Sequence, residues 1–370
     1  VLRQDFEKRW HPLWLAVCAL LLNPETEHPF VLEDLVMAGD ATALAPFEFE
    51  YHDVLIEPSQ KVRPLWNIPA SLLADRNIVS ASELQDRLAC PLKWTLHYSA
   101  KIRPGSMAAL PDDHQLKGTF CHSIFERVFG GGGELPALDA AVAQALATFD
   151  ERLPLDAAPL AQPTQYLERQ RLRSQLENAT RIFVSTLVSG GYRIVGIEVA
   201  LAGHAFGKPL NGWIDCVAKR NNGEEAIIDF KFGGRSKYHA LIAEGRAVQL
   251  ATYAYGRSTA GSDFPAIAYL VLSDGLLFTP SGSSVHGDAQ RAIINAPAIQ
   301  TVWQTFSDAI ESAGDWLTSG APVPARPLQE SSEWPTGVAI VLKVDTKADE
   351  RQEVCRYCDF TRICGLEETT

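Results

Sequence analysis

The sequence contains no apolar run close to the roughly 20 residues that a membrane-spanning helix requires. The apolar stretch from Leu13 to Leu22 is short and lacks the small-residue cleavage site of a signal peptide, so it predicts a buried helix. We therefore expect no membrane partner and a cytoplasmic location. The chain begins with Val1 instead of Met, as expected of a fragment of a longer protein.

Cysteine is too scarce for a disulfide scaffold, with seven residues in 370. An odd count that includes a C-x2-C pair favours a reducing compartment and metal ligation. Three of the seven, Cys355, Cys358 and Cys364, form a C-x2-C-x5-C run near the C-terminus. A fourth, Cys90, lies on the far side of the central region. A centre bound by these four would close the chain into a ring and hold residues 91–354 as one body.

The net charge is −12, and an acidic balance argues against nucleic acid as a partner. The charge is uneven, however, because residues 1–75 carry 12 acidic and 5 basic side chains, which supply −7 of the total. The stretch from Lys231 to Arg257 holds five basic residues and one acidic residue, Glu244. An acidic protein with such a local basic tract can still bind a phosphate backbone along one groove.

The length suggests two domains, or one large domain with additions. Residues 1–22 have helical periodicity, and residues 40–79 are rich in proline and acids, which is typical of an extended connector. A boundary is expected near 76–80. We therefore predict an N-terminal helical and extended region over 1–79, which by its position resembles the end of a helicase-like region, and a second domain over 80–370.

The second domain begins with predicted helices. Ser80, followed three residues later by Glu83, has the spacing of a capping box, and Pro91 should end the first helix and open the next. Cys90 would then lie at a joint between two helices. Apolar periodicity predicts five later helices, over 115–129, 135–152, 165–190, 239–257 and 297–318.

The period of apolar residues changes to that of β-strands after residue 193. Strands are predicted over 194–201, 210–219, 225–231 and 266–273, with a hairpin turn at Asn221-Asn222-Gly223 and a loop over the Gly/Ser-rich 275–288. Helices, then a mixed sheet, then a helix and a further strand give an α/β or α+β arrangement.

Asp229-Phe230-Lys231 is the sharpest local signal for chemistry. Residues i and i+2 of a strand point to the same face, so the carboxylate and the ammonium would stand side by side. The apolar Ile227 and Ile228 lead into the motif, so the charges begin where the strand is buried. Buried charges are costly unless they are paired or bound to a metal. The alternative is a salt-bridged pair at the end of a sheet.

Asp215 strengthens the case for a metal. Positions 215 and 229 are symmetric about Asn222, so a hairpin with an odd-length loop places Asp215 opposite Asp229 on one face. A two-residue turn would put them on opposite faces. Two converging carboxylates repel unless a metal or a proton lies between them. With Lys231 beside them, they would form a divalent-cation site in which the lysine serves as a general base or as a positive charge next to the phosphate.

Three further features could complete such a site. Glu198 lies on the preceding strand and can supply a third carboxylate, although a solvated strand residue is as common. Gln249 and Tyr253 lie four residues apart on a helix and face the same way, as ordinary surface pairs also do. His122 lies on a helix, where a lone histidine is usually structural.

Five motifs follow one another along the chain: Gly118-x3-His122, Glu198, Gly212-x2-Asp215, Asp229-x-Lys231 and Gln249-x3-Tyr253. In this order they resemble the PD-(D/E)xK nuclease superfamily, and more closely its RecB-like branch. The flanking cysteines resemble the iron–sulfur nucleases of that branch, which include the AddB subunit of bacterial helicase–nucleases and the CRISPR-associated exonucleases. The resemblance covers about residues 80–366.

The resemblance implies a restriction-endonuclease-like α/β core, a mixed sheet flanked by helices, whose ends are clasped by a four-cysteine cluster. It assigns the divalent metal, Mg²⁺ or Mn²⁺, to His122, Asp215, Asp229 and the carbonyl of Phe230. Lys231 would orient the attacking water or stabilise charge on the phosphate. Gln249 and Tyr253 would position the substrate strand or Lys231, and Glu198 would join the catalytic carboxylates.

The resemblance also implies that Cys90, Cys355, Cys358 and Cys364 ligate a structural [4Fe–4S] cluster. Four thiolates suit a tetrahedral zinc ion as well, although the x5 gap is wide for a zinc knuckle. The remaining cysteines, Cys18, Cys121 and Cys216, are predicted to be buried small apolar residues.

The implied function is Mg²⁺-dependent hydrolysis of DNA phosphodiesters by an exonuclease in DNA end processing or double-strand break repair. The implied partners are single-stranded or duplex DNA ends and a helicase or helicase–nuclease subunit. The first alternative is a non-catalytic DNA-binding Fe–S structural module of a helicase–nuclease complex. The second is a zinc-stabilised protein with a chance D-x-K motif. The joint presence of His122, Asp215, Asp229 and Lys231 favours the enzyme.

Overall fold

The computed structural model describes residues 65–66, 68, 76–102, 113–258, 263–285, 291–293, 295–318, 323–324, 355 and 358–364. The helix predicted over 1–22 and most of the connector predicted over 40–79 lie outside these residues. Among the described helices, none is long and apolar enough to cross a membrane.

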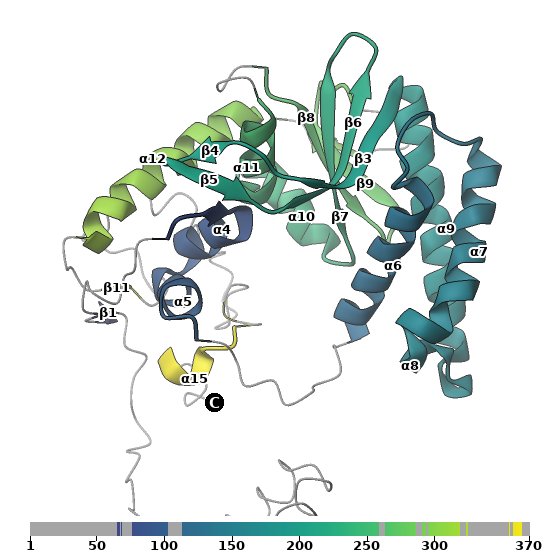
Figure 1. The fold of residues 1–370 in the computed structure, drawn as a ribbon, viewed down its shortest axis with the longest axis horizontal. Coiled ribbons are helices and arrows are strands. Elements are labelled where there is room, and N and C mark those ends of the chain that lie inside the picture. Colours follow the sequence, from purple (N-terminus) through teal and green to yellow (C-terminus); the bar gives the residue numbers. More distant parts are fainter. Residues whose placement is uncertain are drawn as a thin grey trace, which may run out of the picture. The chain divides into compact units, whose positions relative to one another are not determined.

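A six-stranded mixed sheet forms the centre of the fold, in the order β10-β9-β8-β7-β6-β3 (Figure 1). Its strands are β3 (Tyr192–Ala200), β6 (Trp213–Arg220), β7 (Glu225–Lys231), β8 (Ala266–Val271), β9 (Leu276–Pro280) and β10 (Arg291–Ile293). β7 pairs with β8, and β9 with β10, in parallel, whereas the other neighbours are antiparallel. The predicted mixed sheet is confirmed, and β7 has the predicted bounds.

Two sequence predictions about strands are wrong. The strand predicted over 210–219 is interrupted at Gly212, whose φ of +151° suits glycine alone, and it divides into β5 (Lys208–Asn211) and β6. The loop predicted over 275–288 contains β9, because the apolar run that starts at Leu276 is buried against β8 despite its Gly/Ser-rich surroundings.

Helices cover both faces of the sheet (Figure 1). One set comprises α6 (Asp113–Phe129), α7 (Leu138–Asp156), α8 (Ala158–Ala161) and α9 (Tyr166–Ser189), with a 3-10 turn at Pro163–Gln165 before α9. The other comprises α10 (Arg235–Ala243), α11 (Val248–Arg257) and α12 (Ile299–Thr318). The single helix predicted over 239–257 is wrong, because Gly245 adopts a φ of +65° between α10 and α11 and ends the first of them.

Alternation along β7 divides the core into two layers. Phe230 belongs to the layer under α6, α7 and α9, where its ring centre lies 4.9 Å from that of Phe125 and 5.5 Å from that of Phe183. Ile227 belongs to the other layer, under α10, α11 and α12. Asp229 and Lys231 alternate with Phe230, so they point toward the layer that contains α11.

The predicted helix joint around Cys90 is confirmed. Ser80 caps α4 (Ala81–Ala89), because its Oγ accepts a hydrogen bond from the Glu83 N–H at 3.2 Å. Pro91 is the first residue of α5 (Pro91–Trp94), and a π-helical turn, Thr95–Ser99, follows. The remaining elements are short: β1 (Leu65–Trp66), which pairs with β11 (Val323–Pro324), β2 (Val79–Ser80), β4 (His204–Ala205) and α15 (Thr361–Cys364).

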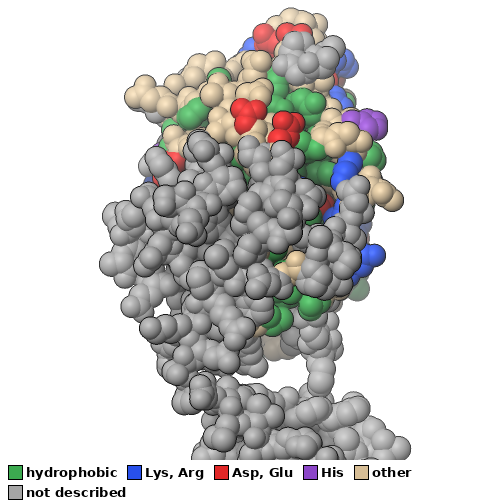
Figure 2. Space-filling view, turned by 90° about the vertical axis from the view of Figure 1, so that its left-hand side faces the viewer, with side chains coloured by type: hydrophobic (Ala, Val, Ile, Leu, Met, Phe, Trp, Pro, Cys, Tyr) green, Lys and Arg blue, Asp and Glu red, His purple; other side chains and the backbone are tan. Residues whose placement is uncertain are grey.

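Charges of both signs lie on the described surface. On the face that Figure 2 shows, acidic side chains lie in the upper half and basic ones mainly along the right-hand edge.

Candidate active site

Asp215 and Asp229 face each other at one end of the sheet. β6 and β7 pair in register as far as Cys216 and Ile228, so the next two opposed positions are Asp215 and Asp229. This is the register predicted for a hairpin centred on Asn222. Both carboxylates therefore stand where the pairing of these two strands ends.

The side chain of Asp215 enters the space where the strands part. The Phe230 N–H donates to Oδ2 of Asp215 at 2.6 Å, so a carboxylate takes the place of a main-chain acceptor. On the other side, Nε2 of His122 lies 3.1 Å from the Phe230 carbonyl oxygen. The main chain of Phe230 thus contacts both the carboxylate of Asp215 and the imidazole of His122.

His122 is arranged to offer a lone pair to a cation. If Nε2 carries the proton that the Phe230 carbonyl accepts, Nδ1 is unprotonated, and Nδ1 lies 4.0 Å from Oδ2 of Asp215. Burial lowers the pKa of His122 to about 4, and the positive charge of Lys231 adds to the effect. The imidazole is therefore neutral near pH 7, as a metal ligand must be.

Glu198 completes a group of three ligand side chains. One ligand atom each from His122, Glu198 and Asp215 lies within 4.8 Å of the others. Glu198 has a φ of +51°, and the pairing of β3 with β6 shifts register between Ile194 and Gly196. A non-glycine residue in this conformation costs about 1 to 3 kcal/mol and persists only where its surroundings impose it. The irregular strand aims the third carboxylate into the site.

The second half of the site is a chain of contacts that begins at Asp229. The Asp229 side chain has no exposed surface, and its Oδ2 lies 2.6 Å from Nζ of Lys231. Nζ of Lys231 also donates to Oε1 of Gln249 at 3.1 Å, and Nε2 of Gln249 donates to the Tyr253 hydroxyl at 2.9 Å. The predicted association of Gln249 and Tyr253 with Lys231 is thus present as direct contacts.

The charges of this site favour a bound cation. Burial and the neighbouring charge of Asp229 raise the pKa of Asp215 well above its usual value, and burial also raises the pKa of Asp229. Burial alone would lower the pKa of Lys231, but Asp229 and Asp215 outweigh it and raise that pKa. Apart from Lys231, neither oxygen of Asp229 has a hydrogen-bond partner in the described part of the chain. Underpaired carboxylates beside a neutral imidazole fit Mg²⁺ or Mn²⁺.

The structure groups the predicted residues differently from the expected ligand set. Glu198 lies with His122 and Asp215, whereas Asp229 is engaged with Lys231. The alternation of side chains along a strand is the sequence signal that could have assigned each carboxylate to its group. It fails at Glu198, because the irregular backbone conformation of this residue cannot be recognised in the sequence.

At a second place, the contacts of the predicted cysteine ligands fall into two groups. Cys90 and Cys364 pack in one small apolar cluster with Leu92, Trp94 and Val323. The pKa of the Cys358 thiol is raised by burial and by the charges of Cys355 and Cys364, which therefore lie near it. Cysteines from both ends of the domain thus lie near one another in a partly buried region.

Lys93 joins the two parts of this cysteine group, and the sequence did not single it out. Its N–H donates to Sγ of Cys90 at 3.4 Å, and its Nζ forms an ion pair with Asp86 at 2.7 Å. Its positive charge also lowers the pKa of the Cys358 thiol. A lysine three residues after the first cysteine was the available signal. Cys121 and Cys216 are buried in the core as predicted, and Cys18 lies outside the described residues.

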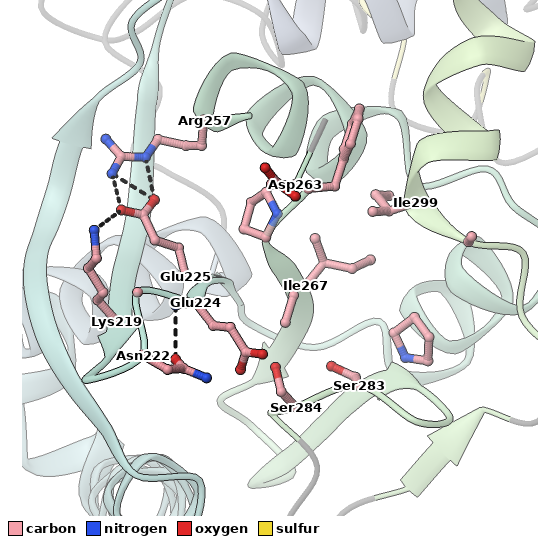
Figure 3. A pocket seen from close by; sticks show the side chains of 16 residues that line it. Lys219, Asn222, Glu224, Glu225, Arg257, Asp263, Ile267, Ser283, Ser284 and Ile299 are labelled. Carbon is pink, nitrogen blue, oxygen red and sulfur yellow. Dashed lines mark hydrogen bonds and ion pairs between the residues drawn. The ribbon is translucent and has the colours of Figure 1, made fainter. Parts of the chain in front are cut away.

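A cavity of about 760 Å³ lies at the opposite end of the same strands. Figure 3 shows Lys219 and Arg257 converging on Glu225 there, with Arg257 Nη2 2.7 Å and Lys219 Nζ 3.5 Å from its carboxylate. These ion pairs join the end of α11 to the start of β7. No predicted site residue is among the described residues that line this cavity, so it is a structural junction apart from the site.

Comparison with known proteins identifies the family. A family model described as the PD-(D/E)XK nuclease superfamily matches residues 78–365, which is more than half of the chain and includes every residue of the site and of the cysteine group. No curated protein matches the chain. Members of this superfamily hydrolyse phosphodiester bonds of nucleic acids with the help of divalent metals. The chain therefore belongs to the PD-(D/E)XK nuclease superfamily.

Proposed function

We propose that this protein is a Mg²⁺- or Mn²⁺-dependent deoxyribonuclease that removes nucleotides from DNA ends. The observation that carries the proposal is the meeting of two groups where β6 and β7 part. One is the ligand group His122, Glu198 and Asp215, and the other is the ion pair of Asp229 and Lys231.

The ligand group would hold the cation through Nδ1 of His122 and the carboxylates of Glu198 and Asp215, with Asp229 and the Phe230 carbonyl next to them. A cation bound there would act as a Lewis acid toward phosphoryl oxygens and would lower the pKa of a bound water. Water adds to phosphorus, the bond to the leaving sugar oxygen breaks, and that oxygen gains a proton.

In addition to the bound cation, the ammonium of Lys231 places a positive charge next to the phosphate. Its ammonium stays protonated, because Asp229 and Asp215 raise its pKa. Asp229 fixes the ammonium from one side and Gln249 from the other, at 2.6 and 3.1 Å. Tyr253 holds the amide of Gln249 in turn. A charge positioned before the reaction stabilises the transition state without further reorganisation.

The cysteine group supports a placement in the RecB-like branch. In this proposal Cys90, Cys355, Cys358 and Cys364 hold a [4Fe–4S] cluster, which ties the two ends of the domain together and adds folding free energy. Zinc is the alternative occupant. The protein would then act in DNA end processing or break repair beside a helicase or helicase–nuclease subunit, as the resemblance to AddB implies.

A direct cleavage assay tests the proposal. Single-stranded and duplex DNA, labelled at one end, are incubated with Mg²⁺ and wild-type protein, Asp229→Ala, Lys231→Ala or Lys219→Ala. Lys219 is a matched control, because it forms its ion pair at the far end of β6. We expect the wild type and the control to release labelled nucleotides and the two site variants to lose the activity. Binding without Mg²⁺-dependent cleavage by the wild type would favour the non-catalytic Fe–S module.

A further inference from the structure

The ammonium group of Lys231 has polar partners on two sides and an aromatic ring on a third. Oδ2 of Asp229 lies 2.6 Å from Nζ, and Oε1 of Gln249 accepts a hydrogen bond from it at 3.1 Å. The ring of Tyr238 faces the same nitrogen, which lies 6.0 Å from the ring centre. An ammonium has three N–H donors, so one is left beside Asp229 and Gln249. The Lys231 side chain is 20% exposed, so this donor can be reached from outside.

The position of Tyr238 follows from the way α10 begins. Gly234, three positions after Lys231, caps the helix with a φ of +73°, and its carbonyl accepts from the Tyr238 N–H at 3.1 Å. A Cβ added to Gly234 would lie 3.0 Å from Cε2 of Tyr238, so the ring lies directly against the glycine. The chain thus turns back after Lys231 and brings the tyrosine ring beside the ammonium.

Tyr269 supports the ring from the side of the sheet. Its ring centre lies 4.9 Å from that of Tyr238, and it is fully buried. Tyr269 is the β8 partner of Asp229, and it belongs to the core layer toward which Asp229 and Lys231 point. A ring packed between Gly234 and a buried tyrosine has little room to move away from the ammonium.

The face of an aromatic ring attracts a cation without neutralising it. The attraction arises from the negative face of the ring, and it grows when water is excluded. Lys237 also lies over the Tyr238 ring, 5.8 Å from its centre, so the ring faces two cations, of which Lys231 is the one in the site. Unlike a third carboxylate, the ring leaves the charge of Lys231 available to a phosphate.

We propose that Tyr238 is a positioning residue for the reaction, and that its ring holds the ammonium of Lys231 so that the remaining N–H points to the phosphate. The proposal rests on the proposed nuclease function. Without the ring, the ammonium would turn toward the space that the ring had filled and would meet the phosphate less often. Charge grows on the phosphate in the transition state, so the contact should contribute to kcat more than to KM.

Steady-state cleavage of end-labelled DNA in Mg²⁺ tests the role. The proteins are wild type, Tyr238→Leu, Tyr238→Phe and Tyr166→Leu. Tyr166 is a matched control, because its ring also faces a cation, Arg169 at 5.4 Å, at the start of α9. We expect Tyr238→Leu to lower kcat about 3- to 30-fold, the range of one cation–π contact, with KM changed less than about 2-fold. Tyr238→Phe keeps the ring face and should restore kcat, and Tyr166→Leu should cleave as the wild type does.

Fluorinated phenylalanines at position 238 separate the charge of the ring face from its bulk. Fluorine withdraws negative charge from the face and changes the size of the ring little, so a cation bound to the face is held more weakly. We expect kcat to fall stepwise through mono-, di- and trifluorinated phenylalanine. Equal kcat throughout the series would mean that the ring only fills space, and would overturn the proposal.

The contact itself is measured without DNA or metal. In protein with isotope-labelled lysine, the ring face shifts the ε-methylene protons of Lys231 upfield, and Lys231→Arg identifies their signal. We expect this shift in the wild type and Tyr238→Phe and its loss in Tyr238→Leu. Equal Lys231 signals in the wild type and Tyr238→Leu, or equal kcat, would overturn the proposal. A wild type that shows the shift but cleaves no DNA would instead remove the nuclease assignment and leave the contact in place.

Discussion

The N–H of Phe230 donates to Oδ2 of Asp215 across 2.6 Å, at the point where β6 and β7 cease to pair. An acid that replaces a main-chain acceptor is fixed by the sheet itself. Its position depends on the register of the hairpin and needs no loop to order it. The same residue, through its carbonyl, lies 3.1 Å from His122 Nε2, so one peptide unit links β6, β7 and α6.

Two substitutions of Asp215 should separate its structural contact from its charge. The amide oxygen of Asp215→Asn can still accept the Phe230 N–H, so we expect a melting temperature close to that of the wild type. The lost negative charge should weaken Mn²⁺ binding at least 10-fold, since a charge about 4 Å from a cation contributes several kcal/mol near a protein surface. Calorimetric titration with Mn²⁺ measures this.

Asp215→Ala removes both the charge and the acceptor, so it should also lower the melting temperature. Glu198→Gln should weaken Mn²⁺ binding as Asp215→Asn does if the three-residue ligand group is correct. Unchanged Mn²⁺ affinity in Glu198→Gln would mean that Glu198 is not a ligand. It would favour the ligand set predicted from the sequence, in which Asp229 binds the metal.

Removing Lys231 should destabilise the fold through Asp229. The carboxylate of Asp229 is fully buried and Lys231 is its ion-pair partner, so Lys231→Met leaves a charge without compensation. Breaking a buried pair in this way costs about 3 to 5 kcal/mol. The loss should grow as pH rises, because the raised pKa of Asp229 lets the carboxyl take up a proton at lower pH.

Urea denaturation of metal-free protein at pH 5 and pH 8 measures this loss. The double variant Asp229→Asn, Lys231→Met carries no buried charge and should recover most of the stability without recovering cleavage. A Lys231→Met protein as stable as the wild type at both pH values would mean that Asp229 is neutral in the native protein.

Much of the sheet was predictable because its signals are local. The apolar run of β7 ends in the charged Asp229 and Lys231, and the turn at Asn222 sets the pairing that brings Asp215 to Asp229. Ser80 and Pro91 act within one helical turn, so the joint at Cys90 could be predicted from neighbouring residues alone.

The features that could not be predicted depend on contacts across the fold. β9 forms because Leu276 meets Val271 of β8, which no local pattern reveals in a Gly/Ser-rich stretch. Glu198 adopts its uncommon φ because β3 shifts register against β6, and this conformation brings its carboxylate to His122.

Loss of the cysteine-bound centre should lower stability before it affects chemistry. The cysteines lie at the two ends of the domain, apart from the ligand group, and a bound centre stabilises the folded state alone. Cys90→Ala should lower the iron content and the melting temperature, and cleavage well below that temperature should persist. Cys121→Ala is the control, because Cys121 is buried in the core and should leave the iron content unchanged. Full stability after iron and zinc removal would contradict a structural role.

Lys93 should tune that centre. Its positive charge lies near Cys358 and its N–H bonds to Cys90, so it stabilises negative charge on sulfur. Lys93→Met retains the main-chain N–H and loses the ammonium. We expect the reduction potential of the cluster to become more negative, as measured by a spectroscopic redox titration. Asp86→Asn, which keeps the lysine and removes its ion-pair partner, should shift the potential in the opposite direction.

His122 should make the metal-free protein sensitive to acid. Its pKa is about 4 in the folded protein, against 6.5 for an unperturbed histidine, so the unfolded chain binds more protons between these values. The stability that neutral His122 contributes is therefore complete above pH 6.5 and is lost as pH falls toward 4, with an upper limit of about 3 kcal/mol. The raised pKa of Asp215 acts in the opposite sense, since its contribution is lost as pH rises.

Urea denaturation in EDTA from pH 4 to pH 7 should show a steeper loss of stability in the wild type than in His122→Gln, which has no group to protonate. Parallel profiles for the two proteins would mean that His122 is solvated and charged in acid, and its imidazole would then be too loosely held to serve as the ligand inferred for it.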